Sequence, residues 1–95
     1  MVKHIVMWTL SEPEKKSETA AIMKQKLEAL VGIVPGLLKL EVGENFTAGT
    51  YDVILYSEFE SREALKNYAT HPAHLAAKEH FWNFLDTRVC ADYDL

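Results

Sequence analysis

The sequence predicts an α+β domain in which one four-stranded antiparallel sheet carries its helices on a single face. Three observations support this prediction. Four segments show the two-residue apolar period of strands, and the segments between them show a helical period. The elements follow the order β-α-β-β-α-(α)-β, which is the split βαβ, or ferredoxin-like, arrangement. Two or three of the strands carry bulky apolar groups on both faces, although the helices can cover only one.

The first predicted strand, VKHIVMWTL (Val2–Leu10), is rich in β-branched and aromatic residues. Successive side chains in a strand point to opposite faces. One face of this strand therefore consists of Val2, His4, Val6, Trp8 and Leu10, and the other of Lys3, Ile5, Met7 and Thr9. Both faces carry large apolar groups, so we expect both to be covered.

A helix is predicted from SEPE (Ser11–Glu14) to about Val31. Ser11 and Glu14 have the spacing of a capping box, and Pro13 falls in the first turn. The apolar stripe of this helix consists of Ala20, Met23, Leu27, Leu30 and Val31. Gly32 is a suitable helix end, and VPG (34–36) turns the chain.

Two further strands are predicted over Leu37–Phe46 and Tyr51–Glu60, with a loop between them. Their apolar residues alternate, and in the earlier strand Leu38, Leu40 and Val42 are expected to share one face.

Two short helices and a last strand complete the pattern. Ser61 caps REALKNYAT, which stops before Pro72, and Pro72 suits the first turn of a helix from Ala73 to about Leu85. The apolar stripe of the second helix consists of Ala77, Phe81, Phe84 and Leu85. The final strand is predicted over Thr87–Tyr93.

The composition is that of an ordinary globular protein. The chain has 95 residues, 48% apolar and 25% charged, so we expect a single domain over residues 1–95. The net charge of −4 and the lack of Lys/Arg-rich runs argue against nucleic-acid binding. We see no signal peptide or membrane span, and we expect no membrane association and a cytoplasmic location. The single cysteine, Cys90, excludes an internal disulfide.

The apolar sheet face opposite the helices needs a cover in water. The simplest cover is a second copy of the same sheet, which gives a two-fold homodimer. Two sheets packed face to face would enclose a barrel-like interior, and we expect the ligand cavity to depend on this pairing.

Three of the four histidines and a tyrosine occur in NYATHPAHLAAKEHF (67–81). His71, His74 and His80 could ligate zinc, but His71 and His74 are separated by a proline and a helix boundary, and no cysteine lies nearby. No zinc-protease spacing, nucleophile elbow, GxGxxG or P-loop is present. We therefore expect no metal and no cofactor.

Acid–base chemistry is the functional interpretation of the same segment. His74 falls in the opening turn of a helix, where the positive end of the dipole favours the neutral imidazole that a general base requires. The hydroxyl of Tyr68 could donate to a substrate oxygen or orient the imidazole. Such a pair could remove a proton beside a carbonyl and stabilise the enolate. His4 becomes a polar contact if its strand face lines the cavity.

A structural interpretation of each of these residues stays open. His71 could cap a helix end, Tyr68 could be a half-buried core residue, and His4 could be a satisfied core histidine. The tryptophans and phenylalanines fit ordinary packing, and Cys90 fits an inert small apolar residue.

The segments VKHIVMW, VPGLLKLEVGEN, YDVILYSEFESREALKNYATHPAH and ADY resemble, in that order and over almost the whole chain, the stress-responsive dimeric α/β-barrel (Dabb) family. NYATHPAH after EFES is the most specific of them. The resemblance implies a ferredoxin-like fold that pairs into a homodimer whose sheets form a barrel. The family includes plant stress-induced proteins and a plant polyketide cyclase that performs an aldol condensation without a cofactor.

The resemblance also implies site residues. The catalytic histidine and tyrosine of the cyclase match His74 and Tyr68, and its other pocket histidines match His4 and His71. A pocket tyrosine in its first helix appears as Leu27 here, which removes a hydroxyl. The predicted ligand-binding set is therefore His4, Val6, Trp8 and His71.

These observations leave two hypotheses. One is a small stress-responsive protein whose cavity takes a small apolar carbonyl or polyketide-like molecule, with His74 and Tyr68 acting as a cofactor-free cyclase, isomerase or lyase. The alternative is a non-catalytic stress-response or ligand-binding homodimer. A monooxygenase of the wider dimeric-barrel group rests on fold analogy alone.

Overall fold

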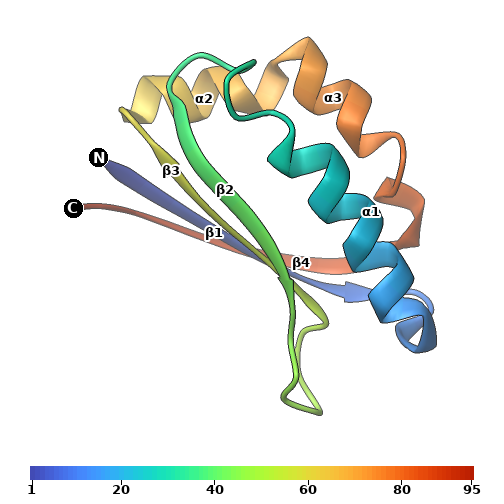
Figure 1. Cartoon of the computed structure of the whole chain (residues 1–95). Helices are drawn as coiled ribbons and strands as arrows, with labels where there is room; N and C mark the ends of the chain where they lie inside the picture. The colour runs from blue at the N-terminus through green and yellow to red at the C-terminus, as the bar shows by residue number, and fades with distance from the viewer.

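Four strands form one antiparallel sheet in the order β2-β3-β1-β4 in the computed structural model, which describes residues 1–95 (Figure 1). The strands are β1 (Val2–Leu10), β2 (Leu37–Glu44), β3 (Val53–Phe59) and β4 (Leu85–Asp94). The helices α1 (Lys16–Glu28), α2 (Arg62–Thr70) and α3 (Pro72–Lys78) all lie over one face of the sheet. This arrangement confirms the predicted ferredoxin-like α+β fold. None of these helices combines the length and apolar character needed to cross a membrane.

Strand β1 lies inside the sheet, with β3 on one side and β4 on the other. His4 is opposite Ser57 of β3 and Asp92 of β4. Ser57 is fully buried, and its hydroxyl donates to the backbone oxygen of His4 at 3.1 Å. The register therefore assigns each residue of β1 a fixed neighbour on both sides.

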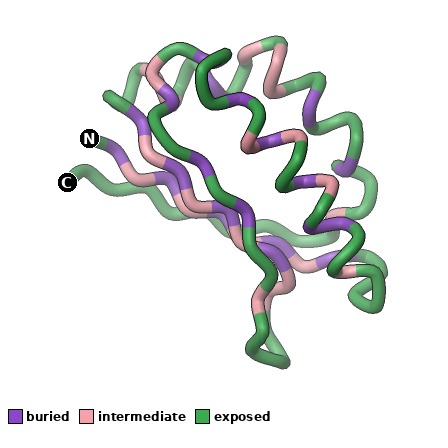
Figure 2. Tube along the Cα trace, viewed as in Figure 1, coloured by how far each residue is buried: buried purple, intermediate pink, exposed green.

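The core lies between the sheet and the helices (Figure 2). In β1 and β3 every second residue is buried and the residues between are partly exposed, as the predicted alternation requires. The largest side chains sealed in this layer are Phe59, Phe81, Met23 and Leu27. Such burial contributes about 1.5–3 kcal/mol for each large apolar side chain, so this layer carries most of the stability.

The start and end of the first helix differ from the prediction. A 3₁₀ turn, Pro13–Lys15, comes first, and neither it nor α1 has a side-chain cap. The backbone nitrogen of Ser11 instead donates to the oxygen of Phe84 at 2.9 Å, so Ser11 is held by a tertiary contact. Helix α1 ends at Glu28, and Val31 is 39% exposed rather than part of the apolar stripe.

The helix pair α2 and α3 follows the predicted break at Pro72. Ser61 caps α2 by accepting from the backbone nitrogen of Ala64, as expected. Helix α3 ends at Lys78, earlier than predicted, because Leu85 pairs with Leu10 and starts β4. Phe84 lies in the 3₁₀ turn Trp82–Phe84 and is 38% exposed, so strand pairing overrides the apolar helical spacing here.

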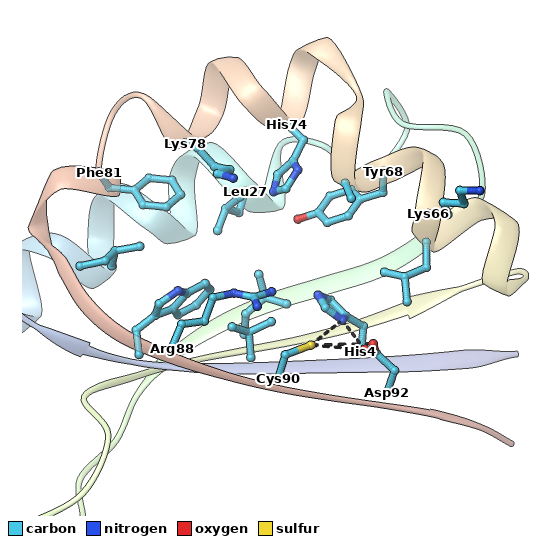
Figure 3. Close-up of a pocket in the computed structure, with 16 residues that line it drawn as sticks. His4, Leu27, Lys66, Tyr68, His74, Lys78, Phe81, Arg88, Cys90 and Asp92 are labelled. Atoms are coloured by element: carbon cyan, nitrogen blue, oxygen red, sulfur yellow. Dashed lines mark hydrogen bonds and ion pairs between the residues drawn. The ribbon is translucent and has the colours of Figure 1, made fainter.

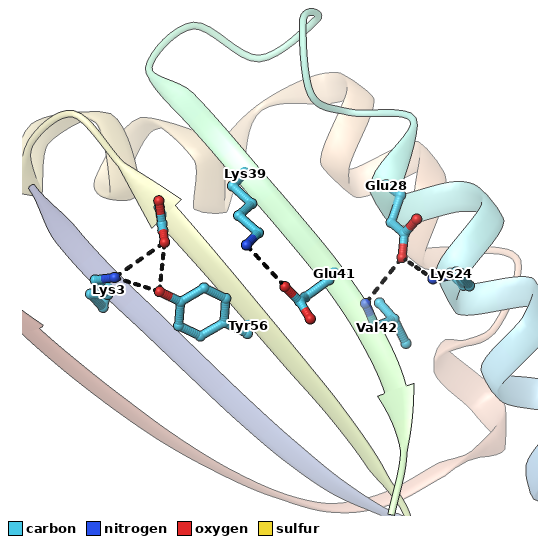
Figure 4. A network of polar contacts seen from close by, with 8 residues as sticks. Lys3, Lys24, Glu28, Lys39, Glu41, Val42 and Tyr56 are labelled. Carbon is cyan, nitrogen blue, oxygen red and sulfur yellow. Dashed lines mark hydrogen bonds and ion pairs between the residues drawn. The ribbon is translucent and has the colours of Figure 1, made fainter.

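The edge strand β2 contains a register shift that the alternation did not predict. The shift lies between Leu37 and Lys39, so Leu37 enters the core and Leu38 is 44% exposed. Farther along this edge, the carboxylate of Glu28 accepts from the backbone nitrogen of Val42 at 3.2 Å and from Lys24 at 2.7 Å (Figure 4). Burial opposes ionisation of Glu28, but these two bonds outweigh it and lower its pKa.

Gly36 is the tightest backbone approach in the turn before β2. Its φ is +81°, and a Cβ there would lie 2.5 Å from the Cβ of Ala64 in α2. Its oxygen accepts from the backbone nitrogen of Glu60 at 2.9 Å, so the turn cannot move freely away from α2. A side chain at this position is excluded both by conformation and by space.

We expect Gly36→Ala to destabilise the fold by about 3–5 kcal/mol, because a left-handed backbone strain of ~1–2 kcal/mol adds to the overlap with Ala64. Gly49→Ala is the matched control, since Gly49 has φ +83° but open space around its Cβ position. Urea unfolding of both variants measures the difference. Equal destabilisation by the two substitutions would show that the contact with Ala64 has no energetic weight.

Candidate functional site

A pocket of about 410 Å³ lies between the sheet and helices α2 and α3 (Figure 3). Its floor comes from β1 and β4, and its roof from the two helices. The helices leave β4 largely uncovered, since every residue from Asp86 to the end of that strand is exposed. The pocket is formed within one chain, so the expectation that the cavity depends on two sheets pairing was wrong.

The pocket is mostly apolar, with polar groups at a few places. Val6 and Trp8 line it from β1, together with His4. Its sixteen lining residues are His4, Val6, Trp8, Leu27, Leu55, Leu65, Lys66, Tyr68, Ala69, His74, Lys78, Phe81, Leu85, Arg88, Cys90 and Asp92. A cavity of this size and composition is typical of sites for small molecules.

Tyr68 and His74 meet in the roof of the pocket. Their rings stack at a centroid distance of 4.0 Å and an interplanar angle of 22°. The break between α2 and α3 produces this contact, because Tyr68 lies near the end of one helix and His74 in the first turn of the next. The Tyr68 hydroxyl points into the pocket in Figure 3. The stacked geometry does not fit the expected role of this hydroxyl in orienting the imidazole.

Burial sets the protonation states of this pair. It lowers the pKa of His74, and the positive charge of Lys78 adds to the effect, while backbone carbonyls of Ala69 and Tyr68 oppose it. Burial also raises the pKa of Tyr68 far above its usual range, although Arg88 opposes the shift. At neutral pH the roof therefore presents a neutral imidazole and a protonated phenol.

His4 occupies the floor beneath this pair. Its Nδ1 bonds to the carboxylate of Asp92, its neighbour on β4, and its ring is 6.4 Å from that of Tyr68. An imidazole that donates from Nδ1 to a carboxylate keeps its other nitrogen free to accept. Phe59 packs edge-on against His4 and tilts against Tyr68, with ring centroids at 6.1 Å and 5.1 Å.

His4, Cys90 and Asp92 form the one group of side chains with metal-ligand character. Their donor atoms lie within 4.8 Å of one another, a set that suits Zn²⁺. Burial and the charge of Asp92 raise the pKa of the Cys90 thiol, however, and a metal ligand must be the thiolate. The nearest partner of His4 is Asp92, and the Sγ of Cys90 lies 3.6 Å from the Nδ1 of His4, so the three side chains form one polar cluster.

His71 and His80 do not line the pocket. The Nδ1 of His71 accepts from the backbone nitrogen of Ala73 at 3.0 Å and so caps α3. His71 therefore does cap a helix, but it accepts from a free backbone N–H at the start of α3 and does not bond to a carbonyl. His80 is exposed in the turn after α3.

Sequence reasoning missed the polar residues that β4 contributes. Arg88, Cys90 and Asp92 alternate on one face of β4, opposite Trp8, Val6 and His4 of β1. Their spacing was visible, but they are more than 75 residues from their partners, and only the strand register brings them together. The sequence analysis assigned no role to Lys66 and Lys78, although both line the pocket.

Comparison with known proteins places the chain in a family. The family model described as Stress responsive A/B Barrel Domain matches residues 2–95. An uncharacterised protein of Streptomyces coelicolor is 30% identical, with 99% of each chain covered.

Two solved structures are also similar. A dimeric protein of unknown function with a ferredoxin-like fold from Bacteroides fragilis is 38% identical, covers 99% of this chain and 95% of its own, and has a TM-score of 0.88. A protein from Arabidopsis thaliana is 27% identical over 100% of this chain and 95% of its own, with a TM-score of 0.78. The chain therefore belongs to the stress-responsive α/β-barrel domain family, whose model covers all of it but the first residue.

Proposed function

We propose that the pocket binds a small apolar carbonyl or polyketide-like molecule and that His74 and Tyr68 perform cofactor-free acid–base chemistry on it, as a cyclase, isomerase or lyase. The observation that carries this proposal is the stacked pair of a neutral imidazole and a protonated phenol in the roof of an otherwise apolar pocket. Titratable groups with shifted pKa values inside a cavity are typical of reactive sites.

A second feature of His74 supports the proposal. Its Nδ1 is buried and makes no hydrogen bond of normal geometry, although the backbone carbonyls of Ala69 and Tyr68 lie near enough to act on its pKa. Buried polar atoms are nearly always paired, and one left unpaired costs free energy. An imidazole that only filled space would be better replaced by an apolar ring, so the cost of this buried nitrogen favours a chemical role for the ring.

The chemical step follows from these positions. The neutral imidazole of His74 takes a proton from the carbon next to the substrate carbonyl, and the electron pair of the broken C–H bond forms the enolate. The Tyr68 hydroxyl donates a hydrogen bond to the enolate oxygen, where negative charge develops. The enolate can then attack a second carbonyl or take its proton back at another position. His4, held by Asp92, contacts the substrate from the floor.

A proton-exchange assay tests the roles of His74 and Tyr68. We expect the protein to accelerate deuterium exchange beside the carbonyl of 2-tetralone in D₂O, followed by NMR. His74→Gln should slow the catalysed exchange by about 100-fold and Tyr68→Phe by about 10- to 100-fold, as for loss of a general base and of an oxyanion donor. His80→Gln, a change outside the pocket, is the control and should leave the rate unchanged.

Two results would favour the non-catalytic ligand-binding protein instead. One is exchange no faster than in buffer, and the other is full exchange by a folded His74→Gln variant, with folding judged by thermal melting. The stacking of Tyr68 on His74 is the observation that suits this alternative, since the rings then stabilise each other without chemistry.

The pH profile of the exchange provides a separate prediction. The pKa of His74 is lowered from 6.5, so the neutral base persists below that pH. We expect a constant rate from pH 8 down to about 6.5 and a fall only at lower pH, as the imidazole becomes protonated. A rate that rises steadily above pH 7 would instead indicate a base with an unshifted or raised pKa.

We further propose that the protein is a homodimer that pairs through the sheet face opposite the helices, here called the outer face. Ile5 and Met7 of β1, Ile54 of β3 and Val89 of β4 lie next to one another there, and none is buried. At one end the face is polar: Lys3 donates to Tyr56 at 2.6 Å and bonds to Glu58 at 3.1 Å (Figure 4). An apolar centre with a polar border is typical of an interface.

The similar Bacteroides protein is described as dimeric, which supports this pairing. The stress-responsive role and the cytoplasmic location remain part of the proposal.

We expect the protein to sediment as a dimer at micromolar concentration. Met7→Lys should raise the dimer dissociation constant by at least about 30-fold, because it places a charge between Ile54 and Val89. Val31→Lys is the control, since Val31 is exposed and lies away from the sheet. Sedimentation velocity measures all three proteins, and a wild-type protein that sediments as a monomer would remove the proposed interface.

A further inference from the structure

The charges around the pocket differ in sign from those of the whole chain. The protein carries a net charge of −4. The pocket nevertheless has three cationic lining residues, Lys66, Lys78 and Arg88, and a single carboxylate, Asp92. They come from three elements, α2, α3 and β4, so the positive charge surrounds the cavity instead of belonging to one surface.

None of these three cations forms an ion pair. Of the seven cations outside the pocket, Lys16 and Lys26 have no carboxylate partner, and five do have one: Lys3, Lys15, Lys24, Lys39 and Arg62. The one acidic group of the pocket does not compensate, because the carboxylate of Asp92 bonds to His4. The positive charge of the pocket is therefore available to an anionic group of a ligand.

The rest of the pocket lining is mostly apolar, so a ligand that uses the positive charge would also need an apolar part. Trp8, Leu27 and Phe81 give the pocket apolar walls. Figure 3 shows Leu27 and Phe81 on the helix side of the cavity and Arg88 on the sheet side. Figure 3 shows Lys78 and His74 projecting from α3 toward the cavity and Arg88 projecting into it from β4. The charge of Arg88 acts on Tyr68, and that of Lys78 acts on His74. An apolar body held by these walls would place a terminal group near Arg88 or Lys78.

We propose that the pocket selects apolar molecules that carry an anionic group, such as acyl or aromatic carboxylates, with Arg88 and Lys78 holding the anion. This inference names the ligand class of the proposed function, and it rests on that proposal for the pocket as a binding site. A guanidinium can bind a carboxylate through two parallel hydrogen bonds, and a lysine adds a point charge. The chemistry of His74 has no part in this selection.

Octanoate and octanamide are matched probes, because they share shape and chain length and differ in charge. Calorimetry should give a dissociation constant about 10-fold lower for octanoate, as expected for two exposed, solvent-screened contacts. Added salt should weaken octanoate binding and leave octanamide binding unchanged. Equal affinities, or tighter binding of octanamide, would overturn the proposal.

Substitutions locate the charge effect. Arg88→Gln and Lys78→Gln should each weaken octanoate binding by about 3- to 5-fold and leave octanamide binding unchanged. Lys26→Gln is the matched control, since Lys26 has no ion-pair partner and lies outside the pocket, yet its substitution changes the net charge equally. A loss as large in Lys26→Gln would assign the effect to overall charge and contradict a site.

Tryptophan fluorescence places the bound probe. The chain has two tryptophans, and Trp82→Phe leaves Trp8 of the pocket as the only one. Octanoate should then change the Trp8 emission, and an unchanged emission with calorimetric binding would put the ligand elsewhere and overturn the assignment.

His74→Gln separates this inference from the catalytic proposal. We expect the variant to keep its preference for octanoate, because His74 is neutral and contributes no charge. Retained preference without proton exchange leaves the anion site standing and removes only the catalysis. A wild-type protein that catalyses exchange but shows no preference for octanoate would have the opposite meaning. The catalytic proposal would stand, and the anion site would be removed.

Discussion

The pairing of β1 with both of its neighbours is the constraint on which the rest of the structure depends. Because β1 runs antiparallel to β3 and β4, each of its residues has a fixed partner on either side. That register puts Asp92 beside His4 and Arg88 beside Trp8, although these partners are more than 75 residues apart in sequence. A slip of one residue would turn the pocket side chains to the outer face and the outer-face side chains to the helices.

The two histidines of the pocket show how the same side chain acquires different properties. His4 has a carboxylate partner and a place on a rigid central strand. His74 has an unpaired, buried nitrogen, lies in the first turn of a short helix and is close to a lysine. Burial and the neighbouring cation both disfavour the charged form of His74. The floor and the roof therefore present imidazoles in different environments: His4 bonds to a carboxylate, and His74 is buried beside a cation.

The spacing of the apolar residues and the residues that mark helix ends were sufficient to predict the fold. The alternation in Val2–Leu10 predicts β1 with its true bounds, and Ser61 and Pro72 mark the helix boundaries where the structure has them. The prediction failed where tertiary contacts compete with local pattern. Leu85 has helical spacing but pairs with Leu10, and Leu38 lies beside a register shift that no local signal marks.

Half of the candidate site was visible in the sequence and half was not. The sequence points to Tyr68, His74, His4, Val6 and Trp8, and all of them line the pocket. The polar residues of β4 were not, because their role depends on which strand lies next to them. The role of His71 is explained by local structure alone, because its side chain caps α3. Short-range patterns identify helix ends, whereas a site that spans two strands needs the register.

The alternation of β1 has a consequence for regulation. Its even-numbered residues face the helices, and His4, Val6 and Trp8 among them line the pocket. Its odd-numbered residues face the outer side, so consecutive positions such as Val6 and Met7 belong to the two surfaces. Any molecule that shifts the backbone of β1 from inside therefore shifts the outer surface too. Linkage is reciprocal: if occupancy strengthens self-association tenfold, self-association strengthens occupancy tenfold. The cellular concentration of the protein would then set its affinity for the pocket ligand, with no separate effector.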